Sequence, residues 1–262
     1  IQSFDDGLTI RNYIQVLFRR KKVVFLSMTL IMLAAVLGLM LQTKTYEATT
    51  KLIISAQKQV ESPYYKEAYA SREMEQTLTQ SEIVKSDPIL TRVVSAQSLD
   101  TRPLSDEKKF ASGLRQALID MEAASLAKQV ESLPEDQQAA FYFRHAKLVL
   151  KKNIKVDPVR GTNMFTITVR DYDPVRAAAI ANTVSRSYLI FDLEQQLAEV
   201  KLKYGDKHPK VLYLKENIAK MIKSLDGKRL EDIDAIGPAS VKIIQQASVP
   251  IQPAGLSKIM LL

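Results

Sequence analysis

Residues able to carry chemistry are few and widely spaced in this chain of 262 residues. It contains two distant histidines, His145 and His208, and no cysteine. Disulfides and thiolate metal sites are therefore excluded, and the histidines do not indicate a zinc cluster. No two of the eight glycines lie closer than ten positions, whereas phosphate-binding loops place their glycines within about five residues. The glycine spacing thus excludes the P-loop and the dinucleotide fingerprint.

Neither histidine has an acid or a nucleophile at a recognisable catalytic spacing. The acidic residues stand beside lysines at helical intervals, as Glu199 does relative to Lys203, which is typical of a solvated helix surface. No serine lies in a nucleophile-elbow context. We therefore predict a protein that is not an enzyme, with no catalytic residue, no cofactor and no metal site.

The main feature of the sequence is an uncharged, apolar run at residues 23–41. As a helix this run is roughly 28 Å long, close to the hydrocarbon thickness of a bilayer. A buried core helix and a cleaved signal peptide are the alternatives. A core helix of this length normally carries charge, and residues 42–46 offer no convincing cleavage site. The run therefore predicts a transmembrane helix.

The charges around this run predict its orientation. Four basic residues precede it, whereas Lys44 is the one basic residue that follows closely; the four are Arg19, Arg20, Lys21 and Lys22. The positive-inside rule then places residues 1–22 in the cytoplasm and the following chain outside it. The formal net charge of the chain is +8, and part of that excess lies in 1–22 beside the anionic inner leaflet. Nucleic acid is not expected as a partner.

A second membrane helix is expected to begin near the end of the sequence. Pro250 and Pro253 favour an extended, stiff segment, and an apolar run starts within 256–262. Residues 42–255 would then form one periplasmic domain with both ends at the same membrane. The predicted fold class is an α+β membrane protein, in which two transmembrane helices, the second truncated, flank a periplasmic α/β base domain with an extended helical projection.

Three segments predict a small sheet with one buried face. Residues 46–55 are rich in β-branched side chains, while 163–171 and 241–249 alternate apolar and polar residues. The first strand follows one membrane helix and the last leads into the other. The sheet is therefore expected close to the bilayer.

The sequence between these strands predicts mainly helices. Their expected positions are 72–84, a helix after Asp87-Pro88, a helix opening at Ser105, and one from Pro134 to about 152. The helix from Ser105 has apolar residues at three- and four-residue spacing, namely Phe110, Leu114, Leu118 and Met121.

A long helix is expected at 175 to about 204. Asp173 and Pro174 are a suitable cap and first-turn residue for it. Within this helix Ala178 belongs to a stripe of small residues that permits close packing against a neighbouring element.

Several strings follow one another in a recognisable order. Four basic residues end at Lys22 before the apolar run, Tyr46-Glu47-Ala48-Thr49 opens the first strand, and 80–90 reads as a short helix pair. The strongest segment spans 154–184 and contains Pro158, Arg160, Gly161, Asn163, Asp173, Pro174, Ala178 and Asn182. Pro250 and Pro253 match part of a proline-rich stretch. Together these strings resemble the polysaccharide co-polymerases, also called chain length determinant (Wzz-like) proteins.

Residues 204–210 are similar to a string in the longer exopolysaccharide-transport members of that family. Those members carry an extended helical hairpin between the positions that match Gln196 and Tyr204, where this chain has seven residues. We therefore expect that coil is missing from the sequence near 199–203 and 224–237.

The resemblance implies a non-enzymatic inner-membrane protein that assembles with copies of itself into a ring. It implies as further partners a polysaccharide polymerase or export machinery, the nascent glycan and the lipid bilayer. The implied role is control of the chain length or export of a surface polysaccharide, whether exopolysaccharide, capsule or O-antigen.

Two other classes share parts of this organisation. A membrane sensor places a periplasmic ligand-binding domain between two helices, and nothing in the sequence separates its topology from the one above. An efflux-pump adaptor joins a membrane anchor to a helical hairpin, but it typically carries glycine-rich, lipoyl-like half-motifs, which this sequence lacks.

Overall fold

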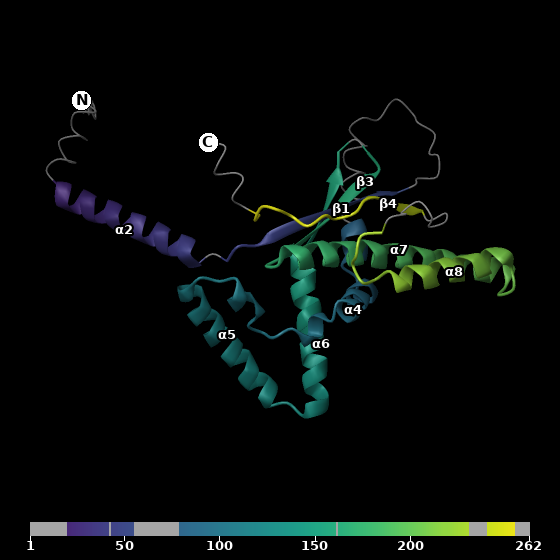
Figure 1. The fold of residues 1–262 in the computed structure, drawn as a ribbon, viewed down its shortest axis with the longest axis horizontal. Helices are drawn as coiled ribbons and strands as arrows, with labels where there is room; N and C mark the ends of the chain where they lie inside the picture. The colour runs from purple at the N-terminus through teal and green to yellow at the C-terminus, as the bar shows by residue number, and fades with distance from the viewer. Residues whose placement is uncertain (1–19, 42, 55–78, 161, 231–239, 255–262) are drawn as a thin grey trace, which may run out of the picture.

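A computed structural model describes residues 20–41, 43–54, 79–160, 162–230 and 240–254 (Figure 1). The described elements are, in chain order, α2 (Lys21–Leu41), β1 (Tyr46–Ile54), α4 (Asp87–Ala96), the 3-10 turns η1 (Leu99–Thr101) and η2 (Asp106–Lys109), α5 (Gly113–Glu131), α6 (Glu135–Asn153), β2 (Ile154–Val159), β3 (Met164–Asp171), α7 (Pro174–Tyr204), α8 (Pro209–Lys223) and β4 (Val241–Gln245). Residues 79–84 are also helical, and the rest of the helix expected at 72–84 lies outside the described residues.

The strands form an antiparallel sheet in the order β2-β3-β1-β4. Strand β1 lies inside the sheet and pairs with β3 from Tyr46 opposite Asp171 to Ile53 opposite Met164. The three strands expected from the sequence are confirmed, although β4 ends at Gln245 rather than near 249. The alternation in β3 is also confirmed, because Phe165, Ile167 and Val169 are all buried.

Strand β2 was missed by the sequence analysis. Its sequence IKVDPV contains Pro158, which has no N–H to donate to a ladder. The strand lies at an edge of the described sheet, where it pairs with β3 alone. An edge strand tolerates proline, so Pro158 is accommodated there.

Helix α7 packs across one face of the sheet and extends well beyond it (Figure 1). Asp173 caps it by accepting hydrogen bonds from the N–H groups of Val175 and Arg176 at 2.9 and 3.5 Å. Pro174 occupies the first turn. The small-residue stripe is buried, with Ala178 5% exposed. The expected cap, first turn and long helix are therefore confirmed.

Helix α8 returns along α7 to form an antiparallel hairpin (Figure 1). The sequence analysis did not predict α8. Its buried side chains recur at three- and four-residue spacing, as Val211, Leu214, Ile218 and Met221. Residues 199–203 are continuous helix, and the chain turns at 205–208. The expectation of missing coil near 199–203 and 224–237 stays a prediction.

The region after α4 differs from the expected helix opening at Ser105. Residues 106–109 form η2, and α5 begins at Gly113. The apolar positions assigned to this helix are all exposed in the structure, namely Phe110, Leu114, Leu118 and Met121. The buried side chains of α5 are instead Ile119 and Val130. The helices expected after Asp87-Pro88 and Pro134 are confirmed as α4 and α6.

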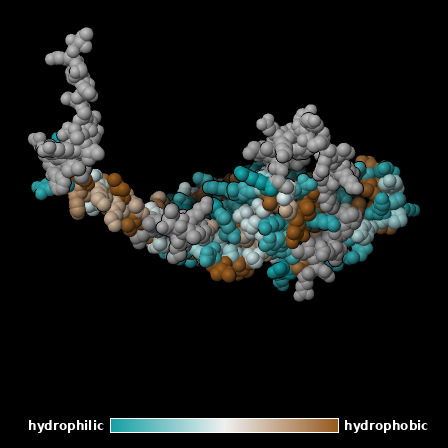
Figure 2. All heavy atoms as spheres, turned by 90° about the horizontal axis from the view of Figure 1, so that it is seen from above, coloured by the Kyte–Doolittle hydropathy of each residue, from teal (hydrophilic) through white to brown (hydrophobic). Residues whose placement is uncertain are grey.

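Helix α2 carries exposed apolar side chains along its length (Figure 2). Within the described residues it is the one helix long and apolar enough to cross a membrane, with a mean hydropathy of 1.8 over Lys21–Gly38 and none of that window buried. Exposed apolar side chains on this scale favour transfer out of water. The expected second helix within 256–262 lies outside the described residues.

Candidate functional site

The two ends of the described domain meet where α2 joins the sheet. The N–H of Ala254 donates a hydrogen bond of 2.7 Å to the carbonyl oxygen of Thr45, the residue before β1. The half-buried Pro250 and Pro253 precede Ala254 and carry the chain toward this junction. The end of the described chain is thereby held next to the end of α2.

A hydrogen-bonded cluster ties the same junction to η2 and α5. The hydroxyl of Thr43 donates to Glu107 Oε1 at 2.6 Å, and Arg115 from α5 donates to the same oxygen at 3.0 Å. Burial alone would raise the pKa of Glu107, but hydrogen bonds from Arg115, Thr43 and Tyr172 outweigh it and lower the pKa. Burial, together with the nearby charge of Glu107, raises the pKa of Tyr172 to about 12.

A second ionic cluster joins η1, η2 and the start of α7 at the end of β3. Arg102 contacts Asp171 at 2.9 Å, and Arg176 contacts Asp106 at 2.7 Å. Asp171 also accepts a hydrogen bond of 3.0 Å from the N–H of Asp173. Burial alone would raise the pKa of Asp106, but Arg176 and then Lys109 outweigh it and lower the pKa. These contacts fix η2 against the sheet.

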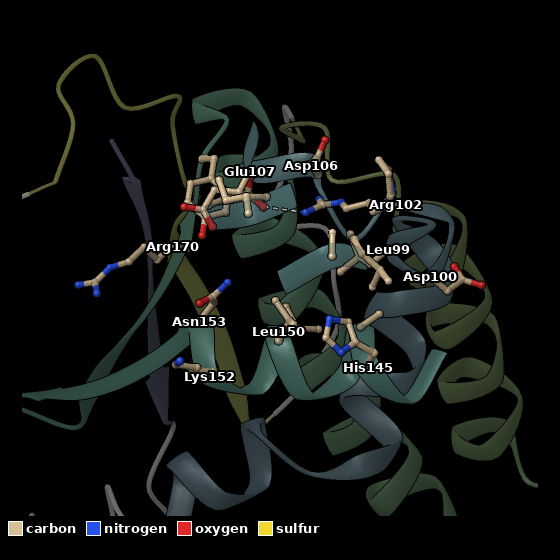
Figure 3. A pocket seen from close by; sticks show the side chains of 18 of the residues that line it. Leu99, Asp100, Arg102, Asp106, Glu107, His145, Leu150, Lys152, Asn153 and Arg170 are labelled. Atoms are coloured by element: carbon tan, nitrogen blue, oxygen red, sulfur yellow. Dashed lines mark hydrogen bonds and ion pairs between the residues drawn. The ribbon is translucent and has the colours of Figure 1, made fainter. Parts of the chain in front are cut away.

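A cleft of about 470 Å³ lies beside these two clusters. In Figure 3, side chains of α6 line one side, including His145, Leu150 and Asn153, while Arg102 and Glu107 lie on the opposite side. The lining also includes Thr45, so the cleft opens near the end of α2. Its volume lies within the roughly 300–1,000 Å³ usual for small-ligand sites. We take it as the candidate functional site.

The sequence analysis missed this cleft. The sequence shows no catalytic partner for His145, and it indicates no role for Arg102, Glu107 or Arg115 in a site. The signal was weak because η1 and η2 bring their side chains to the site through tertiary packing. His208 has a structural role, because its Nδ1 accepts a hydrogen bond of 3.2 Å from the N–H of Lys210 and caps α8.

Asn182 and Arg186 clamp the segments on either side of 231–239 onto α7. The side chain of Asn182 donates to the carbonyl oxygens of Gly227 and Ala247, both at 3.2 Å. Arg186 is fully buried and donates to the carbonyl oxygens of Ser224 and Lys228. Burial lowers the pKa of Arg186. Of the two, the sequence analysis singled out Asn182.

The remaining residues singled out from the sequence occupy separate places. Tyr46 and Ala48 lie in β1, with Ala48 buried opposite Val169. Pro158, Arg160 and Asn163 are exposed around the β2–β3 turn, at the opposite end of β3 from Asp171.

The main-chain oxygen of Asn163 accepts a hydrogen bond of 2.9 Å from the N–H of Ile54. Gly161 and Arg19 lie outside the described residues, and Arg20, Lys21 and Lys22 are exposed at the start of α2. The structure therefore distributes these residues over the sheet, α7 and α2 and does not gather them into one site.

Comparison with known proteins finds a family match over part of the chain. Residues 6–97 match the sequence model of Wzz, described as chain length determinant protein. The matched region includes α2, β1 and α4. No curated protein sequence matches the chain. The family recognised from the sequence is thereby confirmed over this region: residues 6–97 are similar to the chain length determinant proteins of the Wzz family.

Proposed function

We propose that this protein is an inner-membrane polysaccharide co-polymerase that determines the chain length, the export, or both, of a surface polysaccharide. The observation that carries the proposal is the match of residues 6–97 to the chain length determinant family. Members of this family regulate polysaccharide synthesis without catalysis, and we propose the same for this chain. Its polysaccharide is an exopolysaccharide, a capsule or an O-antigen.

The junction at Thr45 supports the proposed two-helix topology. The hydrogen bond from Ala254 to Thr45 places the end of the described chain beside the end of α2. A second membrane helix beginning within 256–262 would therefore enter the bilayer close to α2. Residues 42–255 would then stand in the periplasm as a domain anchored at both ends.

Assembly with copies of itself is part of the proposal. The described sheet has β2 and β4 at its edges, and the unpaired main-chain groups of an edge strand are suited to contact a neighbour. Exposed apolar side chains also lie outside α2, among them Leu148 on α6 and Leu212 on α8. Mass photometry of the full chain in mild detergent tests this, and a monomer at physiological concentration would contradict it.

Deletion of the gene, followed by gel analysis of the surface polysaccharide, tests the proposed function. We expect an altered distribution of chain lengths or a loss of export, restored by the full chain in trans. An unchanged distribution with unchanged export would remove the proposal. The same result would favour the membrane-sensor alternative, whose deletion does not alter the polymer directly.

A further inference from the structure

The cleft beside η2 carries almost no uncompensated charge. Its lining includes four basic and five acidic side chains, but most of them are paired with one another or with a neighbour. Arg170 pairs with Glu47, and Arg115 also lies 3.8 Å from Glu122. Among the charged lining residues in the described chain, Asp100 and Lys152 alone lack an ion pair, and their charges are opposite. A strongly charged ligand would therefore gain little here.

The side of the cleft formed by α6 presents uncharged polar groups. Tyr142, His145 and Asn153 lie on one face of the helix together with Val149, at intervals of three and four residues. Within the part of the chain that the structure describes, the Tyr142 hydroxyl, the His145 ring nitrogens and the Asn153 amide make no hydrogen bond. These three groups offer both donors and acceptors to a ligand.

Aromatic and apolar surface surrounds these polar groups. The aromatic lining consists of Tyr142 and Tyr172, and the His145 ring stacks on Phe141 next to the cleft with 6.2 Å between ring centroids. Figure 3 shows His145 and Leu150 on the side of the cleft that faces Leu99. Lining that combines apolar and aromatic surface with a few fixed polar groups is typical of small-ligand sites. A sugar ring has matching surfaces, because its C–H face is apolar and its hydroxyls donate and accept hydrogen bonds.

We propose that this cleft binds an uncharged segment of a glycan, with Tyr142, His145 and Asn153 as hydrogen-bonding residues. The inference rests on the proposed function, which supplies a polysaccharide as the partner, and it assigns the contact to one place in the fold. Because Thr45 also lines the cleft, the bound segment lies close to the end of α2. In the proposed topology this place lies at the periplasmic surface of the membrane.

The chain contains no tryptophan, so a single introduced indole gives an unambiguous optical signal. Val149 is 45% exposed and lines the cleft, whereas Tyr213 on α8 is 47% exposed and lies outside the lining. The Val149→Trp and Tyr213→Trp variants of the full chain in detergent are titrated with oligosaccharides. The probe is prepared by partial acid hydrolysis of the polysaccharide that the host cell itself makes.

We expect a saturable fluorescence change for Val149→Trp, none for Tyr213→Trp, and little dependence on salt. In the Val149→Trp background, Tyr142→Ala together with Asn153→Ala should weaken binding about tenfold or more, because two hydrogen-bonding groups are removed. Arg144→Ala together with Lys151→Ala is the matched control, since both are exposed side chains on the same helix outside the cleft lining. This control should leave the affinity unchanged.

A second variant distinguishes loss of binding from misfolding, which could also weaken binding in the double alanine variant. Ala123 lines the cleft from α5, and Ala123→Phe fills space without removing a polar group. It should weaken binding while leaving the unfolding midpoint close to that of the parent chain. Absence of a saturable change at Val149→Trp would overturn the proposal, and so would salt-sensitive binding that survives the alanine pair.

The two proposals fail separately. If deletion of the gene alters chain length but the fluorescence of the Val149→Trp variant does not respond, the proposed glycan site is wrong and the proposed regulatory function still stands. If the fluorescence responds but deletion leaves chain length and export unchanged, the regulatory role is wrong.

Discussion

Asn182 in α7 binds the main chain of Ala247 through both of its side-chain amide atoms. Its Nδ2 donates to the carbonyl oxygen of Ala247 at 3.2 Å, and its Oδ1 accepts from the N–H of Ala247 at 2.8 Å. The side chain thus satisfies the main chain of a residue just beyond β4, as a neighbouring strand would. It is 3% exposed, so water does not replace these bonds.

Asn182→Ala should therefore lower the free energy of unfolding by about 2–4 kcal/mol, because main-chain groups of Gly227 and Ala247 lose buried partners. Asn217→Ala on α8 is the matched control. Asn217 is also buried, but its Nδ2 has no hydrogen-bond partner within the described residues. Denaturant titration followed by circular dichroism measures both. Equal losses in the two variants would contradict the role assigned to Asn182.

Gly227 and Gly205 share a positive φ but differ in their surroundings. Their φ angles are +78° and +77°, yet a Cβ at Gly227 would lie 2.6 Å from the carbonyl oxygen of Ala179, while one at Gly205 meets nothing within 4 Å. Gly205→Ala should cost about 1–3 kcal/mol through backbone strain alone, because its φ of 77° and ψ of 169° lie in a region that is essentially restricted to glycine. Gly227→Ala should cost clearly more, because α7 must move away. Similar unfolding midpoints for the two variants would show that the contact between Gly227 and the main chain of Ala179 leaves room for a Cβ.

Local patterns in the sequence were sufficient to predict much of the fold. The alternation at 163–171 predicts β3, and Asp173-Pro174 predicts the start of α7, because each signal depends on neighbouring residues alone. Strand β2 could not be predicted in this way. It contains Pro158, which is acceptable only in an edge strand, and the order of strands in the sheet is a tertiary property that the local sequence does not give.

The candidate site could not be predicted in the same way. The helix expected at Ser105 begins at Gly113, and the apolar residues assigned to it, such as Leu114, are exposed. The turns before it bring Arg102 and Glu107 to the cleft, where Arg102 meets Asp171 from a distant part of the chain and Glu107 meets Arg115 from α5. Such pairing depends on packing that no spacing in the sequence encodes. His145 belongs to the cleft for the same reason.

The stability of the domain should fall in acid because of Asp106 and Glu107. Their pKa values are lowered in the folded state. A carboxyl group with a lowered pKa stabilises the fold above its unfolded pKa, and the contribution is lost as the pH falls through the folded value. The loss of folding stability should therefore begin as the pH drops below the ordinary pKa values, which are 3.8 for Asp106 and 4.5 for Glu107.

The Asp106→Asn, Glu107→Gln double variant should be less stable near neutral pH and should lose less stability on acidification. Denaturant midpoints measured across this pH range test the expectation. Asp206→Asn with Glu216→Gln is the control, because these exposed carboxyls also have lowered pKa values through Lys201 and Lys220. High salt should suppress the effect of the exposed pair far more than that of Asp106 and Glu107. A parent chain whose stability is unchanged on acidification would contradict the assignment.

The absence of cysteine allows a direct test of the orientation of α2. In a chain without native thiols, one introduced cysteine reports its own side of the membrane. Ser125 is exposed on α5, and Ser3 lies before the basic cluster. A membrane-impermeant maleimide applied to spheroplasts should modify the Ser125→Cys variant and spare Ser3→Cys, while both should react after detergent is added. Basic residues are retained on the cytoplasmic side of a span, and four of them end at Lys22. Labelling of Ser3→Cys alone in spheroplasts would reverse the proposed orientation, and protection of both would show that α2 does not carry the domain across the membrane.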